Sequence, residues 1–124
     1  MDSGRIINPQ TAYGQLYGGG MMSYGYGLTE QILVNPKTGQ VYNDNLLDYK
    51  VPTSADVPDM DALFIETEEP TSAYGNKSLG EPPNIAPAPA IRNAVCDALD
   101  GKVFFNQIPL TPERVLMTIE KARE

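Results

Sequence analysis

The fold depends most on residues 8–29, which read NPQTAYGQLYGGGMMSYGYGLT. Asn8 followed by Pro9 is typical of a helix start, with Asn8 as the N-cap and Pro9 at the first helical position. At about 100° per residue, two sets of residues form adjacent stripes on such a helix. The stripes are Gly14, Gly18 and Gly25, and Tyr13, Tyr17 and Tyr24. A flexible glycine–tyrosine segment is the alternative, but the ordered spacing favours a helix that a flat ligand or another backbone can approach closely.

The composition excludes several classes of partner. The chain has 124 residues and a net charge of −7, and its lysines and arginines form no run. Nucleic-acid binding and attachment to an anionic membrane are therefore not expected. Because no apolar run approaches the roughly 20 residues that span a bilayer, we expect a cytoplasmic protein.

The residue types that carry most catalytic chemistry are scarce. Cys96 is the single cysteine and histidine is absent. An internal disulfide, a thiolate-bound zinc or iron–sulfur site and imidazole catalysis are thereby excluded within this chain. Chemistry here must use carboxylates, amides, hydroxyls, lysine or backbone groups, and no metal-ligand set is expected. A cofactor is then expected to bring the reactive centre.

The remaining pattern predicts an α+β fold, as a single domain or fragment over residues 1–124. We expect a glycine-rich N-terminal helix, a small mixed or antiparallel sheet with a hairpin, and two C-terminal helices. The last helix begins at Thr111 and Pro112, a strong cap and first-position pair. The other expected elements are a hairpin of 31–34 and 40–42, strands at 63–65 and 103–105, and a helix entered through Pro87 and Pro89.

One acidic residue stands out. Glu81 lies between Gly80 and two prolines, Pro82 and Pro83. A residue before proline is pushed toward extended geometry, so Glu81 is expected on a stiff backbone with an open flank at Gly80. Such a carboxylate suits a general base, which must lie within hydrogen-bond reach of the proton it takes. A solvated loop acid is the alternative.

Several separate pieces, in this order, resemble one family. They are Asp2-Ser3-Gly4-Arg5-Ile6-Ile7-Asn8-Pro9, Gly14-Gln15-Leu16-Tyr17-Gly18-Gly19, Leu46-Leu47-Asp48-Tyr49-Lys50-Val51-Pro52-Thr53 with Asp56-Val57-Pro58, Asn76-Lys77-Ser78-Leu79-Gly80-Glu81-Pro82-Pro83, and Leu110-Thr111-Pro112-Glu113-Arg114. Together they are similar to the C-terminal part of the molybdopterin-binding subunit of xanthine dehydrogenase and aldehyde oxidase-type molybdenum hydroxylases. The resemblance spans nearly the whole chain.

The resemblance implies a mechanism and a set of site residues. In this family a molybdenum ion held by a pterin dithiolene carries an oxo, a sulfido and a water-derived ligand. A glutamate in a Gly-Glu motif acts as base toward the water-derived ligand, which attacks an electron-poor carbon, and a hydride passes to the sulfido group. That glutamate corresponds to Glu81, and Gln15 corresponds to a glutamine that hydrogen-bonds the pterin. The resemblance further implies that backbone groups before the glutamate line the cofactor, although simple shaping of the loop is as good a reading. Those residues are Lys77, Ser78, Leu79 and Gly80.

The resemblance also implies partners, because family subunits are several-fold longer. We expect the remainder of the molybdopterin-binding subunit, and iron–sulfur clusters and FAD on other domains or subunits. Alone, the chain is expected to be an inactive fragment that self-associates through exposed apolar surface.

Three functions are compatible with the sequence. The leading one is part of a molybdenum hydroxylase that oxidatively hydroxylates an N-heterocycle or an aldehyde, with Glu81 as general base. The alternative is a non-catalytic association or cofactor-chaperoning module that retains the fold. A carboxylate-only hydrolase would need a second acid opposite Glu81, for which Glu66, Glu68 and Glu69 are candidates by composition.

Overall fold

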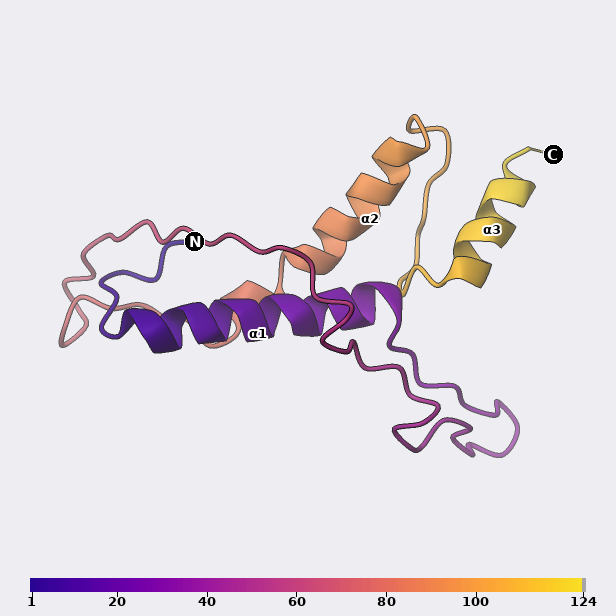
Figure 1. The fold of residues 1–124 in the computed structure, drawn as a ribbon, viewed down its shortest axis with the longest axis horizontal. Helices are drawn as coiled ribbons and strands as arrows, with labels where there is room; N and C mark the ends of the chain where they lie inside the picture. The colour runs from indigo at the N-terminus through magenta and orange to yellow at the C-terminus, as the bar shows by residue number, and fades with distance from the viewer. Residues whose placement is uncertain (124) are drawn as a thin grey trace.

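The computed structural model describes residues 1–123 and is built around one long helix, α1 (Pro9–Leu28). A short 3-10 turn, η1 (Pro82–Asn84), lies against α1, and it is followed by α2 (Pro87–Ala98) and α3 (Pro112–Lys121). Figure 1 shows α2 rising from the middle of α1 and α3 beyond its C-terminal end. The long segment between α1 and η1 has no helix and loops away from α1 before it returns along it.

The N-terminal helix forms as its sequence predicts. The Asn8 side chain accepts a hydrogen bond from Thr11 N at 3.2 Å, which satisfies one of the free N–H groups at the helix start. At the other end, Thr29 N donates to Gly25 O at 2.8 Å. A cap worth about 1 kcal/mol cannot offset the glycines that follow it, so the packing of α1 against η1 and α2 must stabilise the helix as well.

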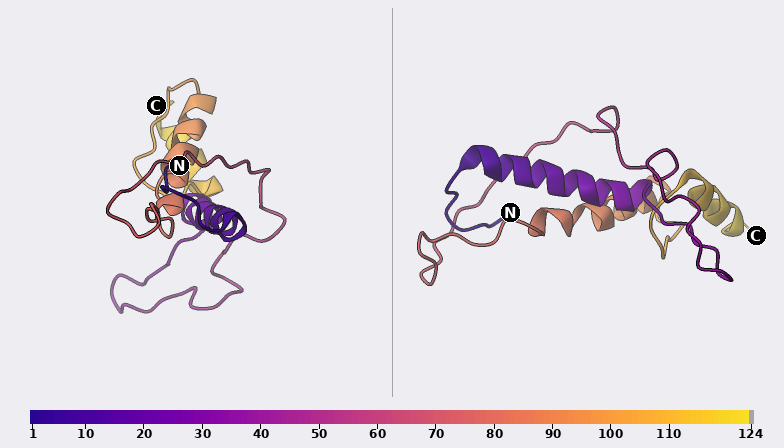
Figure 2. Two further views of the ribbon diagram at one scale, coloured as in Figure 1. Left: turned by 90° about the vertical axis from the view of Figure 1, so that its left-hand side faces the viewer. Right: turned by 90° about the horizontal axis from the view of Figure 1, so that it is seen from below.

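Glycines bring α1 close to the elements that pack on it. A methyl group at Gly19 would lie 2.9 Å from Pro83 Cβ, and one at Gly27 would lie 3.3 Å from Ala88 Cβ. Gly14 and Gly18, in contrast, face open space with no atom within 4 Å of such a group. One part of the helix surface is thus used for backbone packing, while another part stays uncovered. Figure 2 shows α2 running alongside α1 in the view from below.

The buried core lies where α2 and α3 meet the C-terminal end of α1. Its buried members are Cys96, Val103, Phe105 and Leu110, and Leu28, Val95, Leu99, Val115 and Ile119 pack against them. Leu110 N donates to Gly27 O at 2.7 Å, which ties this core to α1. Val115 and Ile119 on α3 pack against this core, whereas Leu116 on the same helix is 56% exposed.

The predicted sheet is wrong. Residues 1–123 contain helices and two isolated antiparallel bridges, Gly4 with Asn76 and Val34 with Val41, but no strand. The expected hairpin does turn back on itself, since Tyr42 N donates to Leu33 O at 2.8 Å. It remains a single bridge because two short segments without a third strand or a packed face do not form a stable ladder. Leu33, Val34 and Tyr42 are each about half exposed.

Within residues 1–123, no helix combines the length and the apolar character that crossing a membrane requires.

Candidate cofactor-binding and catalytic site

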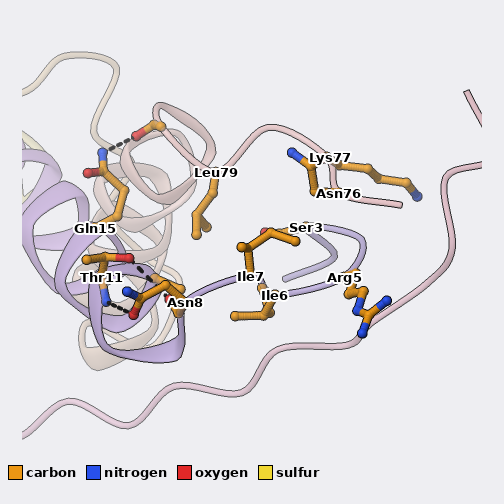
Figure 3. Close-up of a pocket in the computed structure, with 12 residues that line it drawn as sticks. Ser3, Arg5, Ile6, Ile7, Asn8, Thr11, Gln15, Asn76, Lys77 and Leu79 are labelled. Carbon is orange, nitrogen blue, oxygen red and sulfur yellow. Dashed lines mark hydrogen bonds between the residues drawn. The ribbon is translucent and has the colours of Figure 1, made fainter. Parts of the chain in front are cut away.

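The N-terminal segment, the first half of α1 and the loop before η1 enclose an open pocket of about 490 Å³ (Figure 3). Its size is within the usual range for small-molecule sites. The lining residues are Ser3, Arg5, Ile6, Ile7, Asn8, Thr11, Ala12, Gln15, Asn76, Lys77, Leu79 and Gly80. Segments far apart in sequence therefore converge on one cavity.

Backbone pairing holds the N-terminal segment against the loop. Lys77 N donates to Ser3 O at 2.7 Å, and Arg5 N donates to Gly75 O at 2.9 Å. Gly4 lies between these bonds with a φ of +62°, where a side chain would be strained and would approach Lys77 N to 2.9 Å. A glycine at position 4 is thus required for the close crossing of two backbones at the pocket wall.

An ion pair reinforces this crossing. Lys77 Nζ donates to Asp2 Oδ2 at 2.7 Å and to Thr67 Oγ1 at 2.8 Å. The bond from Lys77, together with those from Gly4 N and Thr67, lowers the pKa of Asp2 to about 2. In Figure 3 the Lys77 side chain runs away from Gln15. The charge of Lys77 is therefore used to hold the loop, and only its backbone faces the pocket residues on α1.

Gln15 joins α1 to the residue before Glu81. Its Nε2 donates to Gly80 O at 2.6 Å, across 65 residues of sequence. Figure 3 shows this bond at the helix end of the pocket. An amide nitrogen carries two N–H groups and the side chain also has an acceptor oxygen, so Gln15 keeps a donor and an acceptor for a ligand. The expected binding residue thus also fixes the loop that carries the expected base.

Glu81 lies just beyond this bond, in a second open pocket of about 740 Å³ that shares Gln15 and Gly80 with the first. The open flank expected at Gly80 is present, since a methyl group there would meet nothing within 4 Å. The extended backbone expected at Glu81 is wrong: its φ of −98° and ψ of −29° are right-handed helical. Glu81 starts the 3-10 turn, and Asn84 N donates to its carbonyl at 2.8 Å. The hydrogen bond that closes this turn explains why Glu81 is helical although the following proline favours extended geometry.

The structure brings most of the expected site residues together. Gln15, Lys77, Leu79 and Gly80 line the first pocket, and Glu81 lines the adjoining one with its side chain exposed. Ser78 is exposed and lines neither pocket. Glu66, Glu68 and Glu69 line a separate pocket that Glu81 does not share, so they do not face it.

Sequence reasoning missed several residues of the site. Ser3 lines the first pocket and is 2% exposed, and its hydroxyl has no partner within residues 1–123. Tyr26 and Ser23 contact the segment after Glu81, although the tyrosine stripe pointed to Tyr24. The one signal for Ser3 in the sequence is the Asp-Ser-Gly motif at the N-terminus, which carries part of the family resemblance.

The described chain offers amides, hydroxyls and backbone groups rather than metal ligands. Among residues 1–123 no three histidine, cysteine or acidic side chains are placed to hold a metal ion. The open face at Gly14 and Gly18, the free groups of Gln15 and the unpaired Ser3 hydroxyl fit the organic part of a cofactor. The arrangement of an uncovered glycine face on α1 beside a loop that presents backbone groups could accept an organic cofactor.

Comparison with known proteins identifies the class more closely. Residues 1–58 match the family model of the molybdopterin cofactor-binding domain. The chain is 53% identical, over 92% of its length, to a putative xanthine dehydrogenase molybdenum-binding subunit of Escherichia coli K12, of which it covers 15%. It is 38% identical, over 93% of its length, to the nicotine 6-hydroxylase large subunit of Paenarthrobacter nicotinovorans, of which it covers 14%.

The fold comparison agrees. The crystal structure of quinoline 2-oxidoreductase from Pseudomonas putida 86 matches 97% of the chain with a TM-score of 0.90 and 38% identity, and 15% of that structure is covered. The resemblance to molybdopterin-binding subunits of the xanthine dehydrogenase and aldehyde oxidase family is confirmed, and the chain is related to them along nearly its whole length. It spans about 15% of the length of the curated relatives it matches.

Proposed function

We propose that this chain forms part of the molybdenum–molybdopterin site of a cytoplasmic molybdenum hydroxylase, which oxidatively hydroxylates an N-heterocycle or an aldehyde with Glu81 as general base. One observation carries the proposal. The Gln15 amide donates to Gly80 O at 2.6 Å, so the residue expected to bind the pterin directly holds the residue before the expected base. The names of the related nicotine and quinoline enzymes support a heterocyclic substrate.

The residues of the first pocket would hold the organic part of the cofactor. Gln15, which lines both pockets, offers one N–H and its carbonyl oxygen, and the uncovered face at Gly18 in the adjoining pocket admits a flat group against the helix. Backbone groups of the segment from Lys77 to Gly80 form the opposite wall. When bound, the cofactor supplies the electron-accepting centre and a Lewis acid.

Glu81 would supply the proton chemistry. A general base must lie within about 3 Å of the proton donor, directly or through one water, and the exposed Glu81 carboxylate in a pocket contiguous with Gln15 meets the condition of access. The carboxylate would take the proton of the attacking water, while the oxidised carbon gives up two electrons to the cofactor. Gly80 keeps the approach open because it has no side chain.

The partners belong to the same proposal. Large apolar side chains stay uncovered, among them Leu46 at 85%, Leu47 at 79% and Leu63 at 76% exposed. Exposed apolar surface of this kind marks interfaces. We assign it to the remainder of a molybdopterin-binding subunit, with the iron–sulfur and flavin groups on further domains or subunits, and to self-association when the chain is alone.

The test replaces Glu81 in the assembled enzyme that contains this chain. In Glu81→Gln, kcat should fall by about 10²–10⁴, the usual contribution of a positioned base, while the molybdenum content stays unchanged. Glu120→Gln, at an exposed site on α3, is the matched control and should keep the native rate. A Glu81→Gln enzyme with native kcat and full molybdenum content would refute the catalytic role.

The same exposed apolar surface favours one other function, a non-catalytic association or cofactor-chaperoning module. The two functions differ in one measurement. An assembled complex that retains molybdenum but turns over neither heterocycles nor aldehydes supports the module, and turnover that depends on Glu81 supports the hydroxylase.

A further inference from the structure

A chain of hydrogen bonds links the buried side of α1 to the segment that follows Glu81. Tyr26 Oη donates to Asn84 O at 2.7 Å, and Ser23 Oγ donates to Tyr26 Oη at 3.0 Å. The Ser23 hydroxyl also accepts from Ala88 N at 2.8 Å, at the start of α2. Ser23 is fully buried, with 0% exposure. Two hydroxyls of one helix therefore fix both ends of the segment between Asn84 and Ala88.

These bonds lie next to two close packing contacts between α1 and the segment after Glu81. Pro83 rests on Gly19 and Ala88 rests on Gly27, each at a distance that leaves no room for a methyl group without a shift. Tyr26 belongs to the same face of α1 and reaches the turn between these two contacts. A turn clamped by packing and by directed hydrogen bonds has one position on the helix rather than several.

Glu81 lies between two residues whose backbone carbonyls are hydrogen-bonded to side chains of α1. On one side Gln15 Nε2 donates to Gly80 O, and on the other Tyr26 Oη donates to Asn84 O. Asn84 N in turn donates to Glu81 O at 2.8 Å, so the residue that Tyr26 holds is bonded directly to Glu81. Hydrogen bonds to α1 on both sides of Glu81 therefore hold the backbone that carries its carboxylate.

We propose that Tyr26, supported by Ser23, is a positioning residue for Glu81. Tyr26 fixes the orientation of the 3-10 turn and thereby the direction in which the Glu81 carboxylate points. The proposal rests on the proposed role of Glu81 as base. Catalysis by a base depends steeply on geometry, because a displacement of about 1 Å can cost roughly 10²-fold in rate. Tyr26 touches neither pocket, and its effect passes through the turn.

The experiment uses the assembled enzyme with Tyr26→Phe, which removes the hydroxyl and keeps the ring. Tyr24→Phe is the matched control, because the Tyr24 hydroxyl has no hydrogen bond within residues 1–123. Molybdenum content, kcat, KM and backbone hydrogen exchange over residues 81–90 are measured for each. We expect Tyr26→Phe to lower kcat about tenfold, with KM and molybdenum unchanged and faster exchange in that segment. Tyr24→Phe should match the native enzyme.

A double-variant cycle separates positioning from general destabilisation. In the Glu81→Gln background, Tyr26→Phe should cause no further loss of kcat, because residues that act as a unit are non-additive. A loss that is fully additive, or faster exchange with native kcat, would overturn the positioning role and leave Glu81 as base. Native kcat in Glu81→Gln alone would overturn both proposals.

Discussion

Gln15 on α1 and Gly80 in the loop before η1 are joined by a hydrogen bond of 2.6 Å, although 65 residues separate them in sequence. The bond uses one N–H of the Gln15 amide and leaves a donor and an acceptor on the pocket side. The residue expected to bind the cofactor and the residue next to the expected base are therefore one structural unit. A change at either should affect both cofactor retention and turnover.

Gln15→Glu tests this unit. The substitution replaces the donor with a carboxylate oxygen that would face Gly80 O, so the bond is lost and repulsion replaces it. We expect the assembled enzyme to lose both molybdenum content and kcat. Gln10→Glu, at an exposed position in the first turn of the same helix, adds the same charge and should keep both. Full molybdenum content in Gln15→Glu would contradict the assigned role.

Neighbouring glycines on α1 should respond oppositely to alanine. At Gly18 a methyl group meets open space, so Gly18→Ala should raise the free energy of unfolding by about 0.5–1 kcal/mol through the lower chain entropy. At Gly19 the methyl would lie 2.9 Å from Pro83 Cβ, and such overpacking costs roughly 1–3 kcal/mol. Urea unfolding of the two variants measures the difference, and equal midpoints would contradict the packing described.

The open face at Gly18 has a second consequence. If the cofactor lies against this face, Gly18→Ala fills the space that it needs, and the assembled enzyme should contain less molybdenum although the fold is more stable. Metal analysis of the purified complex measures this directly. A stabilised variant with native molybdenum content would place the cofactor elsewhere.

The ion pair of Asp2 and Lys77 should make the free energy of unfolding depend on pH in the acid range. Because the pKa of Asp2 is lowered to about 2, its contribution is complete above the unfolded value near 4 and is lost as the pH falls from about 4 toward 2. In Asp2→Asn the free energy of unfolding should decline less over this window. Denaturant unfolding at several pH values measures the decline.

Asp59→Asn is the control for this prediction, since Asp59 is exposed and has no hydrogen bond within residues 1–123. It should keep the native pH dependence. An Asp2→Asn variant whose stability declines with acid as steeply as the native protein would show that the pair does not hold the N-terminal segment.

Local signals explain what the sequence could predict. Asn8 and Thr111 both accept the capping bond that their positions before a proline indicate, so α1 and α3 begin where expected. Each of these two capping bonds joins residues only three positions apart in sequence. The prediction of a sheet was wrong because strand formation depends on pairing with other segments of the chain. Within residues 1–123, Val34 forms a bridge with Val41 alone.

The residues of the site also divide into those with a local sequence signal and those placed by long-range contacts. Gln15, Gly80 and Glu81 were identified through a motif resemblance, and the structure brings them together. Tyr26 and Ser23 were not identified, because contacts across 58 and 65 residues leave no periodic or local mark in the sequence. The backbone at Glu81 was mispredicted for a different reason: the bond from Asn84 N to Glu81 O is local, but the two prolines were interpreted only through their effect on the preceding residue and not as the start of a 3-10 turn.

The proposed role of Glu81 is that of the base beside a cofactor held at Gln15. Its most direct test is the rate at which substrate reduces the molybdenum centre in a single turnover, with Glu81→Gln and native enzyme compared at equal molybdenum content. We predict reduction that is slower by about 10²–10⁴ in the variant. Equal rates of reduction would contradict the claim.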